Sequence, residues 1–443
     1  MKFSHDAVLV ADIAEQQVPV PRPDDPNVNN LPTSLVPTYG ALPFLAKVAI
    51  AVLSAWIAAA TTFRGKLLWL RPFLGIAKNR PDVRKLVVFL LKTAVLLLSS
   101  NFALQEVFTR PSRISTNDLM NRYFLPSKLS NYEPVTLSDG NSLGVHFLQH
   151  DAPLGSRRPR FSALYMNHGF GASSMSWLPA IPKLADRLGV KRALAHDAVG
   201  FGFTDRPKDI DRYTPRSSSD IQLALLQTKA ANSSSIILMG HSMGSIATLE
   251  TAARIPQDVA VTVILVAPAL GVLPLKRSEE HGSRRAMMIH RVSDVVYSWV
   301  IHPTVCYTLR RLVGVHGFWK KGLQSVWGDP NLVSDSDALR FQWPSIGAGW
   351  EDGLLRFARA MKRSSSDGDL VRQVLASRPN NNTRIVVILG SRDRVITRTM
   401  VDKVFSEFPE IPILEVEGCG HDPFEENVDV FVDLVEHVLA TGS

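Results

Sequence analysis

The sequence predicts an α/β protein with a mostly parallel sheet, helices on both faces, a helical insertion, and hydrophobic helices near the amino terminus. From about Tyr132 onward, short runs of Val, Ile and Leu alternate with helical stretches. Continuous apolar strands separated by helices are typical of a parallel sheet that is buried on both faces. Of the 443 residues, 45 % are hydrophobic and 20 % are charged, which excludes a disordered, collagen-like or coiled-coil chain.

The individual elements follow from the apolar runs and the turn residues between them. Asp139-Gly140 is a good hairpin turn, and it lies between two strand-like stretches, Val135–Leu137 and Ser142–Leu148. Further strands are expected at Ser162–Asn167, Arg192–His196, Ile236–Met239, Val261–Val266, Arg384–Leu389 and Ile413–Val416. Helices are expected at Met175–Leu188, Asp220–Lys229, Met243–Arg254, Thr399–Phe408 and Asn427–Leu439.

One long interruption divides the folded region into a first core part at 131–270, an insertion at 271–383, and a second core part at 384–443. The insertion lies between two strands, which predicts a cap over the carboxyl edge of the sheet, where ligands bind in open α/β folds. These tryptophans lie in the insertion: Trp299, Trp319, Trp327, Trp343 and Trp350. They either pack the cap against the core or line an apolar substrate pocket, and we expect two of the five to face the pocket.

The amino-terminal part of the chain has a different composition. Residues 1–40 are polar and rich in proline, which predicts a disordered tail. A secretory signal is not expected, because no apolar segment lies near Met1. Residues 41–110 are expected to form membrane-associated hydrophobic helices with a basic connector. Ala41–Phe63 contains one charge, Lys47, and is long enough to cross a hydrocarbon core of about 30 Å as a helix.

A second apolar run, Leu86–Leu104, contains Lys92 and several polar residues. It could span the membrane, lie in the interface, or pair with the first run as a hairpin. The positive-inside rule places the basic connector, Arg64–Lys85, in the cytosol. The side of the membrane on which the folded domain lies then depends on whether one apolar run or both runs span it. The sequence leaves this question and the organelle open.

Charge and cysteine content exclude several classes of protein. The formal net charge is +8, and most of the excess lies in Arg64–Lys85 beside the apolar runs, which suits a membrane surface better than a nucleic-acid groove. Cys306 and Cys419 lie in no metal-binding pattern, and two unpaired thiols are favoured over one disulfide. The sequence contains no glycine-rich nucleotide-binding motif, so neither a metal nor a cofactor is expected.

Gly240-His-Ser242-Met-Gly244 has the pattern G-x-S-x-G and lies between an apolar strand and a helix. A turn this tight needs small residues beside the serine, and it raises the hydroxyl clear of the sheet. The helix that follows points its positive end at the serine, which favours a developing anion. This context predicts that Ser242 is a nucleophile.

From Asn131 to Ser443 the chain resembles the α/β-hydrolase family, and its motifs occur in the family order. His168-Gly169-Phe170-Gly171 follows a strand, as the oxyanion turn of that family does. The resemblance implies an oxyanion hole formed by the N–H groups of Phe170 and Met243. The supporting motif residues are His168, Gly169, Gly240 and Gly244. It also implies that the D-x-x-G-x-G loop beginning at Asp197 supports the site without taking part in the chemistry.

The family places an acid after the strand beyond the cap and a base after the last strand. Asp393 and His421 fit these places, and the order Ser242, Asp393, His421 is the α/β-hydrolase order. Asp422 competes only weakly as the acid, because a neighbour in sequence does not easily reach the buried ring nitrogen of His421.

Other residues are expected to have structural roles. His168 and His241 are expected to brace the scaffold. His146 and Asp151 have the H-x-x-x-x-D spacing of acyltransferases, but they lie on a strand edge away from the elbow. The basic residues that flank Ala286–Ile301 in the insertion are favoured as a solvated helix face over a patch that rests on lipid headgroups.

The resemblance implies a serine hydrolase that needs no cofactor. The apolar, tryptophan-rich cap and the amino-terminal anchor together suggest a hydrophobic ester substrate, so an activity similar to a monoacylglycerol lipase or lipid esterase is expected. A serine at the elbow counts against epoxide hydrolases and haloalkane dehalogenases, which use aspartate there. Carbon–carbon bond hydrolases and haloperoxidases share the serine triad and stay open as alternatives. A ligand receptor or scaffold of the same fold also stays open, and turnover of a simple ester separates it from an enzyme.

Overall fold

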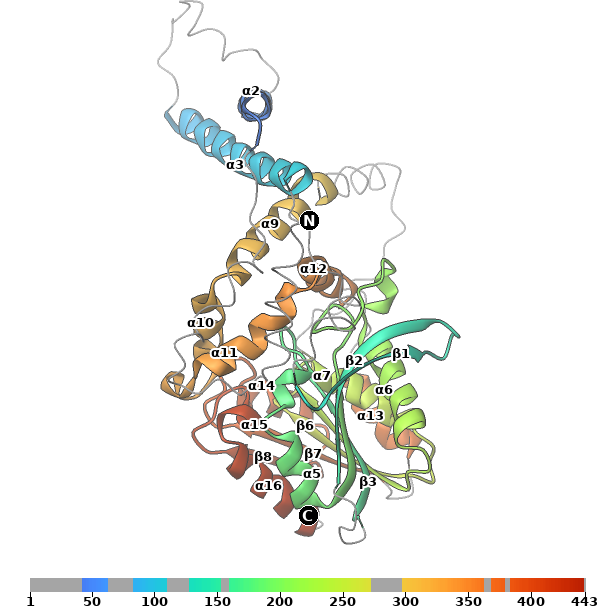
Figure 1. Cartoon of the computed structure of the whole chain (residues 1–443). Helices are drawn as coiled ribbons and strands as arrows, with labels where there is room; N and C mark the ends of the chain where they lie inside the picture. Colours follow the sequence, from blue (N-terminus) through green and yellow to red (C-terminus); the bar gives the residue numbers. More distant parts are fainter. Residues whose placement is uncertain are drawn as a thin grey trace, which may run out of the picture. The chain divides into compact units, whose positions relative to one another are not determined.

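Figure 1 shows the computed structural model of the chain, which describes residues 42–62, 83–109, 127–152, 159–271, 297–361, 368–378 and 383–441. These residues form two compact units. The larger unit contains the described residues of 127–271 and 315–441, and the second unit contains those of 42–109 and 297–314. The tail expected at 1–40 lies outside the described residues.

The larger unit is built on an eight-stranded sheet in the order β1-β2-β4-β3-β5-β6-β7-β8. β1 and β2 form the antiparallel hairpin predicted around Asp139-Gly140, and β2 also pairs with β4 in antiparallel fashion. The strands β3 to β8 are all parallel to one another. The prediction of a mostly parallel sheet is therefore confirmed. The strands are β1 (Ser130–Thr136), β2 (Ser142–Asp151), β3 (Phe161–Asn167), β4 (Val190–His196), β5 (Ser235–His241), β6 (Ala260–Val266), β7 (Thr383–Gly390) and β8 (Ile413–Val416).

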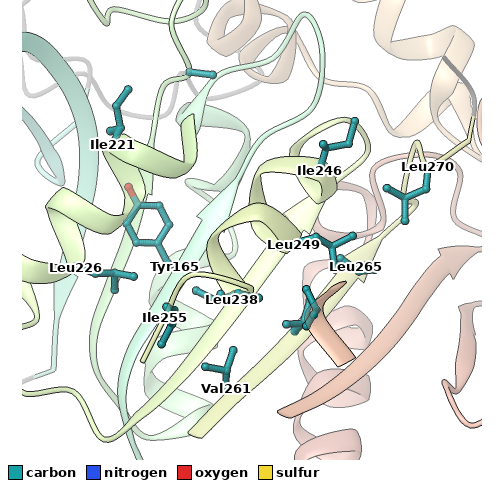
Figure 2. Packing of buried hydrophobic residues seen from close by; sticks show 14 of the residues in the cluster. Tyr165, Ile221, Leu226, Leu238, Ile246, Leu249, Ile255, Val261, Leu265 and Leu270 are labelled. Carbon is teal, nitrogen blue, oxygen red and sulfur yellow. The ribbon is translucent and has the colours of Figure 1, made fainter. Parts of the chain in front are cut away.

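Each face of the sheet has its own apolar core, because successive strand residues point to opposite faces. In β5, Leu238 packs in one core with α6 (Pro215–Lys229), α7 (Gly244–Ala252) and α13 (Gly368–Ser377). Its neighbour Met239 packs in the other core with α5 (Ile181–Leu188) and α16 (Val428–Thr441). Figure 2 shows the first core, where side chains of α6 and α7 meet those of the strands.

One predicted helix is divided in the structure. The stretch expected as a single helix at Met175–Leu188 forms a 3-10 turn, η4 (Ser174–Trp177), followed by α5. Pro182 lies in the first turn of α5, a position that proline favours because the N–H there has no intrahelical partner. The remaining short elements of the core are η5 (Ile210–Arg212), α14 (Arg398–Phe405) and α15 (Pro423–Glu426).

The described part of the insertion contributes to both units. In the larger unit it forms α10 (His316–Val326), η7 (Pro330–Leu332), α11 (Asp335–Gln342), η8 (Trp343–Ile346), α12 (Trp350–Met361) and α13. In the second unit, η6 (Tyr297–Ile301) and α9 (His302–Val313) belong with the amino-terminal helices α2 (Phe44–Thr62) and α3 (Val83–Phe108). Among the described residues, the helix long and apolar enough to cross a membrane is Val87–Phe108, whereas α2 contributes a shorter apolar stretch, Ala46–Ala55.

The buried residue Asp197, which directly follows β4, forms hydrogen bonds with three other parts of the chain. The Asp197 carboxylate accepts hydrogen bonds from the N–H groups of Ser174 at 2.7 Å and Phe203 at 2.6 Å. It also pairs with Nδ1 of His146 at 2.8 Å. A Cβ on Gly202 would lie 1.8 Å from this carboxylate, so the loop requires glycine there. This geometry agrees with the supporting role implied for the D-x-x-G-x-G loop.

Replacing this carboxylate is expected to destabilise the fold. Asp197→Asn presents an amide to backbone donors that need an acceptor, and we expect the free energy of unfolding to fall by about 3 kcal/mol. Thermal or denaturant unfolding of the purified chain measures this. The control is Asp429→Asn, which removes an exposed pair with Lys183 and is expected to cost no more than about 1 kcal/mol. Equal losses in the two variants would contradict the prediction.

Candidate active site

The turn between β5 and α7 has the backbone conformation expected of a nucleophile elbow. Ser242 has a φ of +51°, in the left-handed region that residues other than glycine rarely adopt. The two glycines of the motif leave no room for a side chain. A Cβ on Gly240 would lie 2.4 Å from Oγ1 of Thr248, and one on Gly244 would lie 2.6 Å from the carbonyl oxygen of His168. The G-x-S-x-G spacing is therefore required by packing.

The turn after β3 packs directly on this elbow. A Cβ on Gly169 would lie 2.8 Å from Nδ1 of His241 and 3.1 Å from Cβ of Ser242. The ring of His168 is held at both nitrogens, because Nδ1 bonds the carbonyl of Gly169 at 2.8 Å and Nε2 accepts from the N–H of Ala198 at 3.0 Å. Burial lowers the pKa of His168, which keeps the ring neutral. His168 is thus a brace, as expected.

The two N–H groups expected in the oxyanion hole belong to Phe170 in this turn and Met243 in the elbow. Within the described part of the chain, neither group donates to a protein acceptor. Two N–H groups without an acceptor beside a serine are what a tetrahedral oxyanion requires. Their assignment to an oxyanion hole stays a prediction.

The structure brings together the acid and base expected from the sequence. Nδ1 of His421, after β8, lies 2.8 Å from Oδ2 of Asp393, after β7, and both side chains are buried. The other carboxylate oxygen, Oδ1, accepts the N–H groups of Val395 at 2.7 Å and Ile396 at 2.9 Å. The Asp393 carboxylate is therefore fixed in orientation. It bonds Nδ1 of His421 and leaves Nε2, on the other side of the ring, without this contact.

The charges around His421 favour its protonated form. Burial lowers the pKa of His421, but the hydrogen bond to Asp393 and the negative charges of Asp422, Asp393 and Glu426 outweigh it. The net result is a pKa above the ordinary value. Such surroundings suit a general base that becomes charged during a reaction.

Ser242 and His421 lie on the wall of one cavity of about 250 Å³. Much of the remaining wall is aromatic or aliphatic, and α10 of the cap supplies one face of it. The lining residues with apolar side chains are Phe170, Ala172, Phe318, Trp319, Leu323, Val326 and Phe341. Of the five tryptophans in the insertion, Trp319 lines this cavity, one fewer than expected.

Residues 168–434, which are more than half of the chain, match the family model described as "Alpha/beta hydrolase family". The chain belongs to the α/β-hydrolase family. It is similar to "Abhydrolase domain-containing protein abhd-5.2" of Caenorhabditis elegans, with 24 % identity over 305 residues. The match covers 65 % of this chain and 62 % of the relative, so the chain spans less than two thirds of that protein's length.

Two further comparisons agree with the family. A 2-hydroxymuconate semialdehyde hydrolase of Pseudomonas is 26 % identical over 302 residues, which cover 67 % of this chain and 91 % of the relative. The crystal structure of Cfl2 from Burkholderia cenocepacia covers 70 % of this chain and 94 % of its own, with a TM-score of 0.50 and 17 % identity. This structural likeness shows the fold alone, and the predicted α/β-hydrolase fold is confirmed.

In this α/β-hydrolase, the cap is hydrogen-bonded to the base loop, which we define as residues 418–422. The N–H of His421 donates to the carbonyl of Val326 at the end of α10, at 2.9 Å. The Glu426 carboxylate accepts the N–H groups of Gly328 at 2.7 Å and Gly420 at 2.8 Å, and so joins cap and base loop. Glu426 was not predicted, because nothing in one sequence separates it from the many other acidic residues.

Asp422 and His241 lie beside His421, and Asp422 does not take the place of Asp393 as the partner of the His421 ring. The carboxylate of Asp422 lies 3.3 Å from Nε2 of His241, whereas the ring of His421 faces Asp393. Burial raises the pKa of Asp422 to about 6. Nε2 of His241 also lies 3.0 Å from the carbonyl of His421, so His241 links the elbow to the base loop. Burial lowers the pKa of His241 well below its ordinary value, which favours a neutral brace.

The acyltransferase-like pair does not form a site. His146 bonds Asp197 and the hydroxyl of Ser130 through its two ring nitrogens. Asp151 pairs instead with Arg192. The spacing of His146 and Asp151 therefore has no catalytic meaning here, in agreement with the expectation.

The Asp393 contact predicts the pH dependence of activity. Because a base must be neutral to accept a proton, activity should rise with pH as His421 deprotonates, with the midpoint above 6.5, its ordinary pKa. Asp393→Asn removes the charge that raises this pKa. The midpoint should move to lower pH, and kcat should fall by about 10,000-fold. The pH profile of kcat/KM on a soluble ester tests this, with the exposed Asp402→Asn as control. An unmoved midpoint would argue against Asp393 as the partner of the base.

Glu426→Gln tests the link between cap and base loop. The amide keeps the volume but places a donor opposite N–H donors, so the base loop should lose its fixed position. We expect kcat to fall by roughly 100-fold, as for a small displacement of a catalytic group. The acid limb of the pH profile should also move to lower pH, because Glu426 raises the pKa of His421. The control is Glu417→Gln in the exposed turn before the base, which should change neither quantity. Equal effects of the two variants would refute the role of Glu426.

Proposed function

We propose that this α/β-hydrolase cleaves carboxylic esters with an apolar acyl chain, such as an acylglycerol or another lipid ester. Ser242 is the proposed nucleophile, His421 the base and Asp393 the orienting acid. The observation that carries the proposal is that a serine in a left-handed turn and a histidine bonded to Asp393 lie on one cavity wall. Phe170 and Met243 are the proposed oxyanion donors.

The proposed reaction is acyl transfer to water. Nε2 of His421 takes the proton of the Ser242 hydroxyl as its oxygen attacks the ester carbonyl carbon. The carbonyl oxygen becomes an anion and is stabilised by the two backbone N–H groups. The leaving alcohol receives the proton from His421 as the C–O bond breaks. A water molecule, deprotonated by the same histidine, then releases the acid and restores the serine.

The apolar substrate class is supported by the cavity and by the second unit. The aromatic wall formed by Phe170, Phe318, Trp319 and Phe341 favours an acyl chain over a charged group. The apolar helix Val87–Phe108 is long enough to cross a membrane, and 6 % of its apolar 18-residue window is buried within the structure. We propose that α3, together with α2, associates the protein with a membrane, where such substrates are found.

A carbon–carbon bond hydrolase is the second candidate. It is favoured by the similarity to the 2-hydroxymuconate semialdehyde hydrolase, of which 91 % is covered. The same serine and histidine serve in that scheme, but a C–C bond breaks, and the leaving group is a stabilised carbanion that receives the proton from His421. A panel that pairs acyl esters with ring-cleavage dienoates separates the two candidates by their kcat/KM values.

Ser242→Ala tests the proposed function directly. The wild-type chain, extracted from membranes, should label with a fluorophosphonate probe and hydrolyse p-nitrophenyl esters, more efficiently for longer acyl chains. Removing the nucleophile should abolish labelling and lower kcat at least about 10,000-fold. Ser406→Ala, which changes an exposed serine, should retain both activities. A folded wild-type protein that neither labels nor turns over would favour a receptor or scaffold of the same fold.

A further inference from the structure

The first helices of the insertion run along α3 in the second unit. Oγ1 of Thr304 in α9 donates to the carbonyl of Ser99 in α3 at 3.0 Å. One turn further along both helices, the rings of Tyr307 and Phe102 are stacked, with centroids 4.7 Å apart. Since the residue numbers rise together, the two helices are parallel side by side. η6, which precedes α9, also contacts α3.

A buried ion pair continues this contact toward the end of α3. Nη1 of Arg310 donates to Oε1 of Glu106, and the two residues are 4 % and 7 % exposed. A buried charge is costly unless it is paired, so removal of either group would weaken the contact between α9 and α3. α9 is therefore docked on α3 by a specific contact in addition to apolar packing.

Large apolar side chains are exposed on α3 and on η6. On α3, Leu91 and Val95 are 61 % and 62 % exposed. On η6, Trp299 is 71 % exposed, and Ile301 is also exposed. Because α9 begins opposite Ser99, η6 lies beside the central part of the apolar helix Val87–Phe108. That helix is about 33 Å long, which matches a hydrocarbon core of about 30 Å.

We propose that η6, which α9 holds against α3, is a second membrane-contacting element, in which Trp299 and Ile301 lie against the acyl chains of the bilayer that holds α3. A phospholipid bilayer is the occupant that fits, because the exposed apolar surface of η6 is continuous with a helix of membrane-spanning length. The inference rests on the proposed membrane association of α3, and it adds that the insertion itself enters the lipid.

The test places a fluorescent label at single added cysteines in the full chain. Both native cysteines, Cys306 and Cys419, are buried, so an added exposed cysteine reacts selectively under native conditions. The variants are Trp299→Cys on η6, Val95→Cys on α3, and Val430→Cys, an exposed apolar position on α16 of the larger unit. Each is labelled with nitrobenzoxadiazole and reconstituted into phosphatidylcholine vesicles with and without acyl-chain nitroxide lipids.

The expected result is at least twofold quenching by the nitroxide lipids at positions 299 and 95, with none at 430. Quenching at 95 with none at 299 would overturn the inference and leave the membrane association of α3 intact. No quenching at either position would overturn the membrane association itself. A blue-shifted label at 299 that nitroxide lipids do not quench would indicate contact with a second copy of the chain, which also overturns the inference.

A second variant tests the docking of α9. Arg310→Met removes the charge that pairs with Glu106, so the contact between α9 and α3 should weaken and quenching at 299 should fall at least twofold. Quenching at 95 should stay unchanged. Adding Glu106→Gln to Arg310→Met should restore part of the quenching at 299. Unchanged quenching at 299 in Arg310→Met would show that the ion pair does not hold η6 in place.

Discussion

The left-handed backbone at Ser242 is the constraint on which the rest of the site depends. A residue other than glycine in this conformation costs roughly 1–2 kcal/mol. Three hydrogen bonds offset the cost: the N–H of Ser242 donates to Val266 of β6, and its carbonyl accepts from Ser245 and Ala269. The turn can exist because β5 lies in the middle of the sheet, where a neighbouring strand supplies an acceptor. The same turn forces glycine on both sides and brings the His168–Gly171 loop into contact with the serine.

Around the proposed base, four carboxylates lie close together, and their surroundings give each a different role. Asp393 accepts two backbone N–H groups and bonds the imidazole. Glu426 accepts backbone N–H groups from both cap and base loop. Asp422 and Glu425 are buried, and burial raises the pKa of each carboxyl above its ordinary value. Glu425 is paired with Arg340 of α11, which gives the cap a second connection to the segment after the base.

What the sequence could predict depended on how local the signal was. The elbow, the oxyanion turn and the positions of Asp393 and His421 each follow an apolar strand directly, so one short motif defines both the element and the side chain. Glu426 and Gly328 could not be found this way, because their role is a contact between segments almost one hundred residues apart. The docking of Arg310 on Glu106 is longer in range still, and both residues lie in stretches that look like ordinary helix surface. The prediction that two tryptophans of the insertion line the cavity was wrong, because composition does not reveal which face of a cap helix points inward.

The insertion contributes helices to both units of the chain. Its first described helices belong with the apolar α3, and the next helix, α10, lines the cavity and ends on a carbonyl that accepts the N–H of His421. On our proposals, one continuous segment would thus contact lipid at η6, form the wall that meets an acyl chain at α10, and hold His421 through the carbonyl of Val326. A displacement of α10 would alter the cavity wall and the base loop together, because both depend on the same helix. On the proposed function, substrate binding in the cavity and the position of His421 would therefore depend on the same helix.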